Sequence, residues 1–196
     1  MSLGHDKLIL ETERLIIRPY VIDDLPTIHP ILNAGFGESP LDERRFWLEW
    51  QIMSYTALSA LYQPPYGDRA LILKATGELI GSVGWVPSYG PFDKLPYFRA
   101  RSTEPSSELA RPEMGLFWVL GESHRGQGYA TEAAQKMIDF MFNDFGLKRI
   151  VATTEYDNAA SIAVMKRLGM TVERNPDDEP AYFQVIGILE NPTLER

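Results

Sequence analysis

Residues 111–145 constrain the fold most, because a strand pattern, a glycine turn and a helix pattern follow one another without interruption. The apolar run RPEMGLFWVL at 111–120 is typical of a strand, and SHRGQGYATEA then places Gly126 and Gly128 before a helix-forming run. From Ala130 the apolar side chains recur at i, i+3, i+4 and i+7, which predicts an amphipathic helix. Glycine allows a close backbone approach and a helix start offers unpaired N–H groups, so the turn predicts an anion site, most simply for a phosphate.

The rest of the chain alternates strand-like and helix-like segments, which predicts a mixed α/β fold with a mostly antiparallel sheet flanked by helices. Residues 88–110 hold three prolines and many small polar residues, and we interpret them as a long loop, either a substrate-side lid or a mobile segment. The expected elements are a strand at 8–20, helices at 21–35 and 41–62, a hairpin at 69–87, strands at 111–120 and 148–156, helices at 130–145 and 157–169, and closing strands at 171–175 and 181–190.

Length and composition limit the function further. A chain of 196 residues fits one domain, 1–196, with the 88–110 loop inserted between two strands. The net charge of −8 argues against nucleic-acid or anionic-membrane binding and favours a cationic or amine-bearing substrate. There is no cysteine, so disulfides, thiolate metal sites and a cysteine nucleophile are excluded. No apolar run approaches the roughly 20 residues of a membrane span, and we expect a cytoplasmic protein.

Three phosphate-binding interpretations of the glycine turn compete with a purely structural one. A Walker A loop requires Lys and Ser or Thr after its last glycine, whereas Tyr129 and Ala130 follow Gly128. A dinucleotide fingerprint requires a third Gly or Ala where this chain has Thr131, and it expects the turn early in the chain. A third possibility follows from a family resemblance of the same residues. Structurally, the glycines could simply tighten a strand-to-helix turn.

The stretch Arg125-Gly126-Gln127-Gly128-Tyr129-Ala130 resembles the R/Q-x-x-G-x-G/A signature of the GNAT superfamily of acyl-coenzyme A-dependent N-acyltransferases. The resemblance extends through RIVATTEYDNAASIAVMKRLGM, with Asn158, Ser161 and Gly169 in the family's places, and the opening LETERLIIRPY is similar to the ribosomal-protein N-acetyltransferase (RimJ/RimL-like) branch. It covers nearly the whole chain except 88–110. It implies a GNAT fold whose sheet is splayed between its fourth and fifth strands.

The resemblance also implies a binding mode for acetyl-coenzyme A (acetyl-CoA) as cosubstrate. The pantetheine would lie along a strand edge and bond to the backbone of Trp118, Val119 and Leu120, with a backbone N–H near Val119 for the oxyanion. The expected cofactor-binding residues are Trp118, Val119, Leu120, Arg125, Gly126, Gln127, Gly128, Tyr129, Ala130, Thr131, Asn158 and Ser161. The amides of 126–131 and the helix dipole would hold the pyrophosphate, while Arg125 either adds charge or is a solvated surface residue.

The predicted reaction is direct attack of a neutral amine on the thioester within a ternary complex. Glu113 is the candidate base that takes the amine proton, and Glu155 is the reserve; Glu113 could equally be a solvated strand-edge residue. Many relatives carry a tyrosine acid at the position occupied here by Met165, so Ser161 is the candidate acid for the leaving thiolate. Asn158 could be only a helix cap, Ser161 only a small packing residue, and Met165 belongs to the core.

The acceptor is expected to be a small-molecule or peptide amine, such as a protein N-terminus or a polyamine. Its identity would depend on the first two helices, on residues 88–110 and on the closing hairpin. The side chains of Trp47, Trp50, Tyr97 and Phe98 either line that pocket or pack in the core. No metal site is expected, because the histidines are scattered, and a homodimer is left open. The alternative function is a non-catalytic acyl-CoA-binding or sensor domain, which the missing tyrosine suggests.

Overall fold

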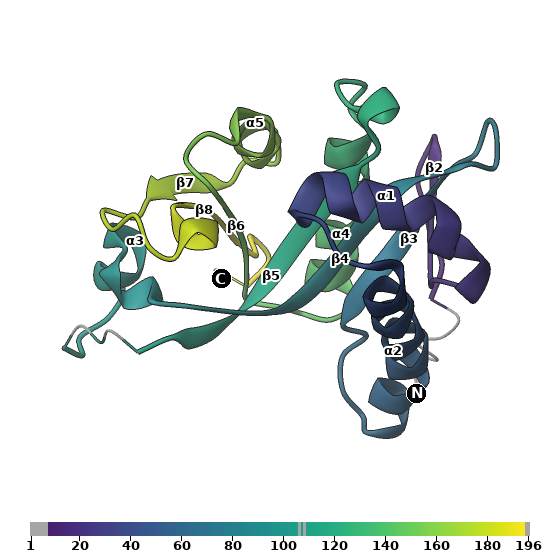
Figure 1. The fold of residues 1–196 in the computed structure, drawn as a ribbon. Helices are drawn as coiled ribbons and strands as arrows, with labels where there is room; N and C mark the ends of the chain where they lie inside the picture. The colour runs from purple at the N-terminus through teal and green to yellow at the C-terminus, as the bar shows by residue number, and fades with distance from the viewer. Residues whose placement is uncertain (1–7, 106, 108, 195–196) are drawn as a thin grey trace. The chain divides into compact units, whose positions relative to one another are not determined.

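The computed structural model describes residues 8–105, 107 and 109–194, and its ribbon is drawn in Figure 1. The strands are β1 (Leu10–Glu11), β2 (Leu15–Arg18), β3 (Gly67–Leu73), β4 (Leu79–Gly90), β5 (Arg111–Leu120), β6 (Arg149–Thr154), β7 (Thr171–Arg174) and β8 (Val185–Glu190). The α-helices are α1 (Leu25–Phe36), α2 (Leu41–Ala60), α3 (Pro96–Arg99), α4 (Tyr129–Asn143) and α5 (Ala159–Arg167). Short 3₁₀ turns lie at Ile22–Asp24, Phe92–Lys94, Glu122–His124 and Ala181–Phe183.

The chain divides into two compact units. One contains the residues up to Trp85 together with Phe117–Phe140, and the other contains Val86–Leu116 and the residues from Met141 onward. The strands β4 and β5 and the helix α4 each contribute residues to both units.

The first unit is a layered sheet with strand order β1-β2-β3-β4-β5. Its first three pairings are antiparallel, with Ile16 opposite Ile72 and Ala70 opposite Ser82. Because successive side chains alternate between faces, Ala70 and Ile72 point to one face and Leu71 to the other. Figure 1 shows α1 and α2 on one side of these strands and α4 on the other.

The face toward α1 and α2 carries the main core of the first unit. It joins Tyr20, Leu25, Ile28, Leu32, Leu48, Ala70, Ile72, Leu79 and Val119, all buried. At Gly35 helix α1 passes so close to β5 that an added Cβ would lie 2.6 Å from Cγ2 of Val119. The predicted helix end near Gly35 is confirmed: α1 ends at Phe36, and the φ of 97° at Gly37 allows the chain to leave the helix.

In the second unit β5 pairs in parallel with β6 at Gly115 and Val151, and β6, β8 and β7 follow as antiparallel neighbours. Its core is aromatic and β-branched and joins Phe92, Leu95, Tyr97, Phe98, Val151, Phe183, Ile186 and Ile188. The antiparallel majority of strand pairs, with helices against them, confirms the predicted fold class.

Two expectations need correction. The strand expected at 8–20 is a hairpin of β1 and β2, because the Thr12 hydroxyl accepts a hydrogen bond from the Leu15 amide at 2.9 Å and turns the chain.

Residues 88–110 are not one loop: β4 continues to Gly90, and α3 buries Tyr97 and Phe98. Residues 106 and 108 of that stretch, and 1–7 and 195–196 of the expected single domain, lie outside the described residues. The single domain itself stays a prediction.

Within the described part of the chain, no helix is long and apolar enough to cross a membrane.

Candidate functional site

The end of β5 leads directly into the predicted anion-binding turn, and both belong to the first unit. Trp118 is half-buried, while Val119 and Leu120 are buried. The Gly121 amide donates to the Ile80 carbonyl at 2.9 Å, which keeps the strand end beside β4. Arg125 folds back and donates from Nε to the Leu120 carbonyl at 3.1 Å. Arg125 therefore has a structural contact that the sequence did not indicate.

The turn has the backbone shape that its glycines predict. Gly126 and Gly128 have φ angles of 75° and 85°, in the left-handed region that favours glycine. Residues 125–128 are exposed, and α4 begins at Tyr129 immediately afterwards. The first amides of a helix have no partner within the helix, so the turn presents donors to solvent at the positive end of α4.

A carboxylate on the first turn of α4 fixes this turn to the N-terminal hairpin. Glu132 accepts from the Arg14 amide at 3.0 Å, from Arg14 Nε at 2.6 Å and from the Thr12 hydroxyl at 2.5 Å. Arg14 also donates from Nη1 to the Gln127 carbonyl at 3.0 Å and lies over the Tyr129 ring at 4.4 Å. Burial opposes ionisation of Glu132, but the hydrogen bonds from Thr12 and Arg14 outweigh it and lower its pKa. The hairpin thus shapes the turn without occupying its outward amides.

In the second unit, Asn158 and Ser161 lie at the start of α5. The Asn158 side chain caps this helix by accepting the Ser161 amide at 3.0 Å, which satisfies one otherwise unpaired donor. Ser161 is half-buried, and its hydroxyl makes no hydrogen bond to any residue that the structure describes. Met165 is fully buried, with its side chain against Gly187, so its assignment to the core is confirmed.

The two carboxylates proposed from the sequence as the base also lie in the second unit. Glu113 forms a two-point ion pair with Arg149, through Nε to Oε2 at 3.1 Å and through Nη2 to Oε1. Arg149 also donates from Nη1 to Glu190 Oε1 at 3.3 Å and lies over the Phe98 ring at 4.6 Å. Glu155 is exposed at the end of β6. Both oxygens of the Glu113 carboxylate are therefore occupied by Arg149 in this structure.

Sequence reasoning missed Asp68, a carboxylate on β3 beneath α2. Its carbonyl accepts the Tyr55 hydroxyl, and its amide donates to Gln51 Oε1 at 3.2 Å. Its carboxylate accepts no hydrogen bond and forms no ion pair with any described residue. Burial raises the pKa of Asp68 to about 7, although the positive charge of Arg44 acts in the opposite direction. The signal in the sequence was the charged pair Asp68-Arg69 at the head of an apolar strand, which the expected hairpin at 69–87 cut in two.

The four aromatic residues considered for the acceptor pocket have different positions. Tyr97 and Phe98 belong to the core of the second unit. Trp47 packs against the core of the first unit, with its ring 5.7 Å from that of Tyr20. Trp50 is 51% exposed on the outer side of α2, so core packing does not explain it. Among the described residues no cluster of His, Asp and Glu could hold a metal ion.

Residues 14–171 match the family described as the acetyltransferase (GNAT) domain. The chain belongs to the GNAT acetyltransferase family. Its curated relatives include a Bacillus licheniformis protein, p20, described as an uncharacterised N-acetyltransferase, which is 34% identical over 65% of this chain and 61% of its own length. The Bacillus subtilis protein YnaD is 41% identical over 29% of this chain and 33% of its own length. The match to these two relatives therefore spans less than two thirds of each.

Other relatives of this GNAT domain match over more of their length. The spermidine N(1)-acetyltransferase of Escherichia coli K12 is 24% identical over 80% of this chain and 73% of its own length. Among solved structures, the ribosomal-protein-S5-alanine acetyltransferase of Vibrio fischeri aligns with a TM-score of 0.66 and 16% identity over 97% of this chain and all of that one. A GNAT-family acetyltransferase of Bacillus anthracis aligns with a TM-score of 0.64 and 19% identity over 92% and 96%. At these identities the two structures show the shared fold.

Proposed function

We propose that this GNAT domain transfers an acetyl group from acetyl-CoA to a primary amine by direct attack in a ternary complex. The observation that carries the proposal is the turn at 125–131, where two glycines of positive φ expose backbone amides at the positive end of α4. The backbone of Trp118–Leu120, on the strand that leads into the turn, is assigned to the pantetheine and the oxyanion. Acetyl-CoA supplies the activated acyl group, and the chain supplies the binding and proton-transfer groups.

The remaining roles come from the sequence. Ser161 is proposed to protonate the leaving thiolate, a role consistent with a hydroxyl that has no described partner. Asn158 is proposed to act at the cofactor in addition to capping α5. Glu113 stays a predicted base, although Arg149 contacts both of its carboxylate oxygens, and Glu155 stays the reserve. Spermidine and protein N-termini are the proposed acceptors, because related proteins carry those names. We also propose a cytoplasmic location.

Binding is tested by the increase in melting temperature that acetyl-CoA produces, set beside NAD. A ligand that binds only the folded state stabilises it by mass action, by about 2.7 kcal/mol at 100 times its Kd. We expect a shift with acetyl-CoA and none with NAD. Stabilisation by NAD alone would contradict the proposed cofactor.

The turn itself is tested with Gly128→Ala and a matched control, Gly77→Ala. Both glycines have positive φ, 85° and 74°, so both substitutions strain the backbone by about 1 kcal/mol. Gly77 lies in the turn between β3 and β4 and is not one of the proposed cradle residues. We expect both variants to melt earlier and only Gly128→Ala to bind acetyl-CoA more weakly. Equal affinity in the two variants would remove the turn from the site.

The second candidate is a non-catalytic acyl-CoA sensor, which the buried Met165 in place of the usual tyrosine favours. Release of free thiol from acetyl-CoA with a panel of amines separates the two functions. Turnover that falls in Ser161→Ala supports the transferase, whereas tight binding without turnover on any amine supports the sensor.

A further inference from the structure

The corner between β1 and β2 is fixed to the neighbouring strand. Lys74, the residue that follows β3, donates from its amide to the Arg14 carbonyl at 2.9 Å and from Nζ to the Thr12 carbonyl at 2.7 Å. The Thr12 hydroxyl also accepts the Leu15 amide at 2.9 Å. Because these bonds hold the backbone of the corner, the side chains of Thr12 and Arg14 start from defined positions.

These two residues surround the carboxylate of Glu132 in the first turn of α4. Oε1 accepts the Thr12 hydroxyl at 2.5 Å and the Arg14 amide at 3.0 Å, and Oε2 lies 2.6 Å from both Nε and Nη2 of Arg14. The positive end of a helix attracts any nearby anion, so this carboxylate competes with a bound phosphate for the same partial charge. Arg14 supplies the positive charge that offsets the carboxylate.

The Arg14 guanidinium also contacts the glycine turn. Nη1 donates to the Gln127 carbonyl at 3.0 Å, and a Cβ at Gly128 would lie 3.4 Å from Nη2. The Gln127 carbonyl and the Gly128 amide belong to one planar trans peptide group, so they point in opposite directions. The hydrogen bond from Arg14 therefore turns the Gly128 amide away from the hairpin, in a turn whose residues 125–128 are exposed.

We propose that Arg14 is a positioning residue for acetyl-CoA, which orients the Gly128 amide toward the pyrophosphate and offsets the charge of Glu132 beside it. The inference rests on the proposed acetyl transfer and extends its cofactor site to the N-terminal hairpin, 113 positions before Gln127. Arg14 acts through the turn and takes no part in the transfer of the acetyl group or of a proton. We therefore expect its loss to weaken acetyl-CoA binding and to leave the turnover rate of the saturated enzyme unchanged.

Arg18 of β2 provides a matched control. Its Nη1 and Nη2 donate to Oδ2 and Oδ1 of Asp24, each at 2.7 Å, and Nη1 also donates to the Pro19 carbonyl at 3.0 Å. Arg18 thus has the same kinds of partner as Arg14, a carboxylate bound at two points and a backbone carbonyl, and neither partner belongs to the turn. Arg14→Met and Arg18→Met each remove one such set of contacts, so we expect similar losses in melting temperature.

The affinity for acetyl-CoA is measured by isothermal titration calorimetry. The proteins compared are the wild type, Arg14→Met, Arg14→Lys, Arg18→Met and the double variant that combines Arg14→Met with Glu132→Gln. KM for acetyl-CoA and kcat are measured with the amine that the wild type acetylates fastest, in a panel that includes spermidine and a short peptide with a free N-terminus. The melting temperature without ligand is recorded for each protein.

We expect Arg14→Met to raise Kd and KM for acetyl-CoA about tenfold and to leave kcat within about twofold of the wild type. Arg14→Lys keeps the charge without the planar two-point contact, so its loss of affinity is smaller, about threefold. The double variant binds more tightly than Arg14→Met although it has fewer contacts, because the uncompensated carboxylate is gone. A merely structural role for Arg14 would not restore affinity in this way. Arg18→Met keeps the wild-type Kd.

A wild-type Kd in Arg14→Met, or an equal rise in Arg18→Met, overturns this inference and leaves the proposed acetyl transfer intact. A double variant that binds no better than Arg14→Met overturns the charge role assigned to Arg14. If Arg14→Met does not fold, Arg14→Lys carries the same comparison with Arg18→Lys. A wild-type protein that binds acetyl-CoA and acetylates no amine overturns the proposed transfer, while the Kd values still test Arg14. A wild-type protein that does not bind acetyl-CoA overturns both.

Discussion

Glu113 and Asp68 are strand carboxylates of the two units, and their surroundings are opposite. Glu113 of the second unit is held at both oxygens by Arg149, which also binds Glu190 and covers the Phe98 ring. Asp68 of the first unit has its backbone fixed by Tyr55 and Gln51, but its carboxylate has no described partner. A carboxylate paired with an arginine stabilises the fold in its charged form, whereas an unpaired one costs stability and is available to a ligand.

The largest effect we expect is in the second unit, from Arg149→Met. This change leaves Glu113 and Glu190 without their cation, and we expect a loss of roughly 3 kcal/mol in the free energy of unfolding. Urea denaturation at pH 7 measures it. Arg167→Met, at the exposed end of α5, is the control and changes stability by less than about 0.5 kcal/mol. A similar loss of stability in both variants would show that the ion pairs of Arg149 stabilise the fold no more than the exposed Arg167 does.

The opposite sign is expected for Asp68→Asn in the first unit. Burial raises the pKa of Asp68 from 3.8 to about 7, so between these pH values the folded protein keeps a proton that the unfolded chain has lost. The contribution of Asp68 to the free energy of unfolding therefore falls as the pH rises through this range. Because Asp68 keeps contact with water, we expect Asp68→Asn to be about 2 kcal/mol more stable at pH 8 and equal to the wild type at pH 4. If Asp68→Asn were instead less stable than the wild type at pH 8, the charged carboxylate of Asp68 would stabilise the fold.

A smaller effect on stability is expected at Glu132, a carboxylate of the first unit that is paired, unlike Asp68. Its pKa is lowered, so its contribution is present above about pH 4.5 and is lost as the pH falls through the folded pKa. We expect Glu132→Gln to lose about 1 kcal/mol at pH 7 and to unfold with a weaker pH dependence between 5 and 3. Glu122→Gln, an exposed carboxylate nearby in the chain, should retain the wild-type dependence.

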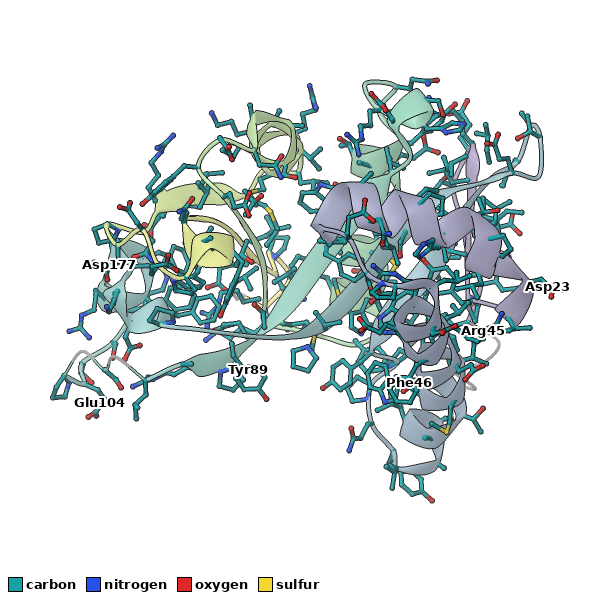
Figure 2. All side chains as sticks on the ribbon, viewed as in Figure 1. Asp23, Arg45, Phe46, Tyr89, Glu104 and Asp177 are labelled. Atoms are coloured by element: carbon teal, nitrogen blue, oxygen red, sulfur yellow. The ribbon has the colours of Figure 1, made fainter. Side chains whose placement is uncertain are left out.

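The smallest effect is expected at Phe46 of α2, and Leu48 of the same helix is its buried control. Phe46, which is labelled in Figure 2, is 72% exposed on α2, whereas Leu48 of the same helix is fully buried. We expect Phe46→Ser to change the free energy of unfolding by less than about 0.5 kcal/mol and Leu48→Ala to lower it by about 3 kcal/mol. Equal losses would show that the outer side of α2 is covered in solution.

Phe46, Trp50 and Met53 recur at helical spacing within the helix predicted at 41–62, but this spacing does not show which side of α2 faces the core. All three are more than half exposed, and the buried positions are Leu48, Gln51 and Tyr55. Helical spacing shows that apolar residues share one side of a helix. Whether that side is buried depends on the residues of the sheet that pack against it. The cap at Asn158, the φ angles of Gly126 and Gly128 and the amphipathic α4 were predictable because each depends on neighbours within one or two turns.

By itself, the sequence determined the mixed α/β order of elements, the family and the glycine turn ahead of α4. These features follow from local periodicity, capping and backbone freedom, all of which act over a few residues. The partners of the carboxylates were decided only by tertiary structure, because strands β5 and β6 bring Glu113 beside Arg149, which is 36 positions away in the sequence. That long-range pairing occupies Glu113, whereas Asp68 forms no ion pair with any residue that the structure describes. The charge state of a carboxylate depends on the cations and the burial that the fold places around it.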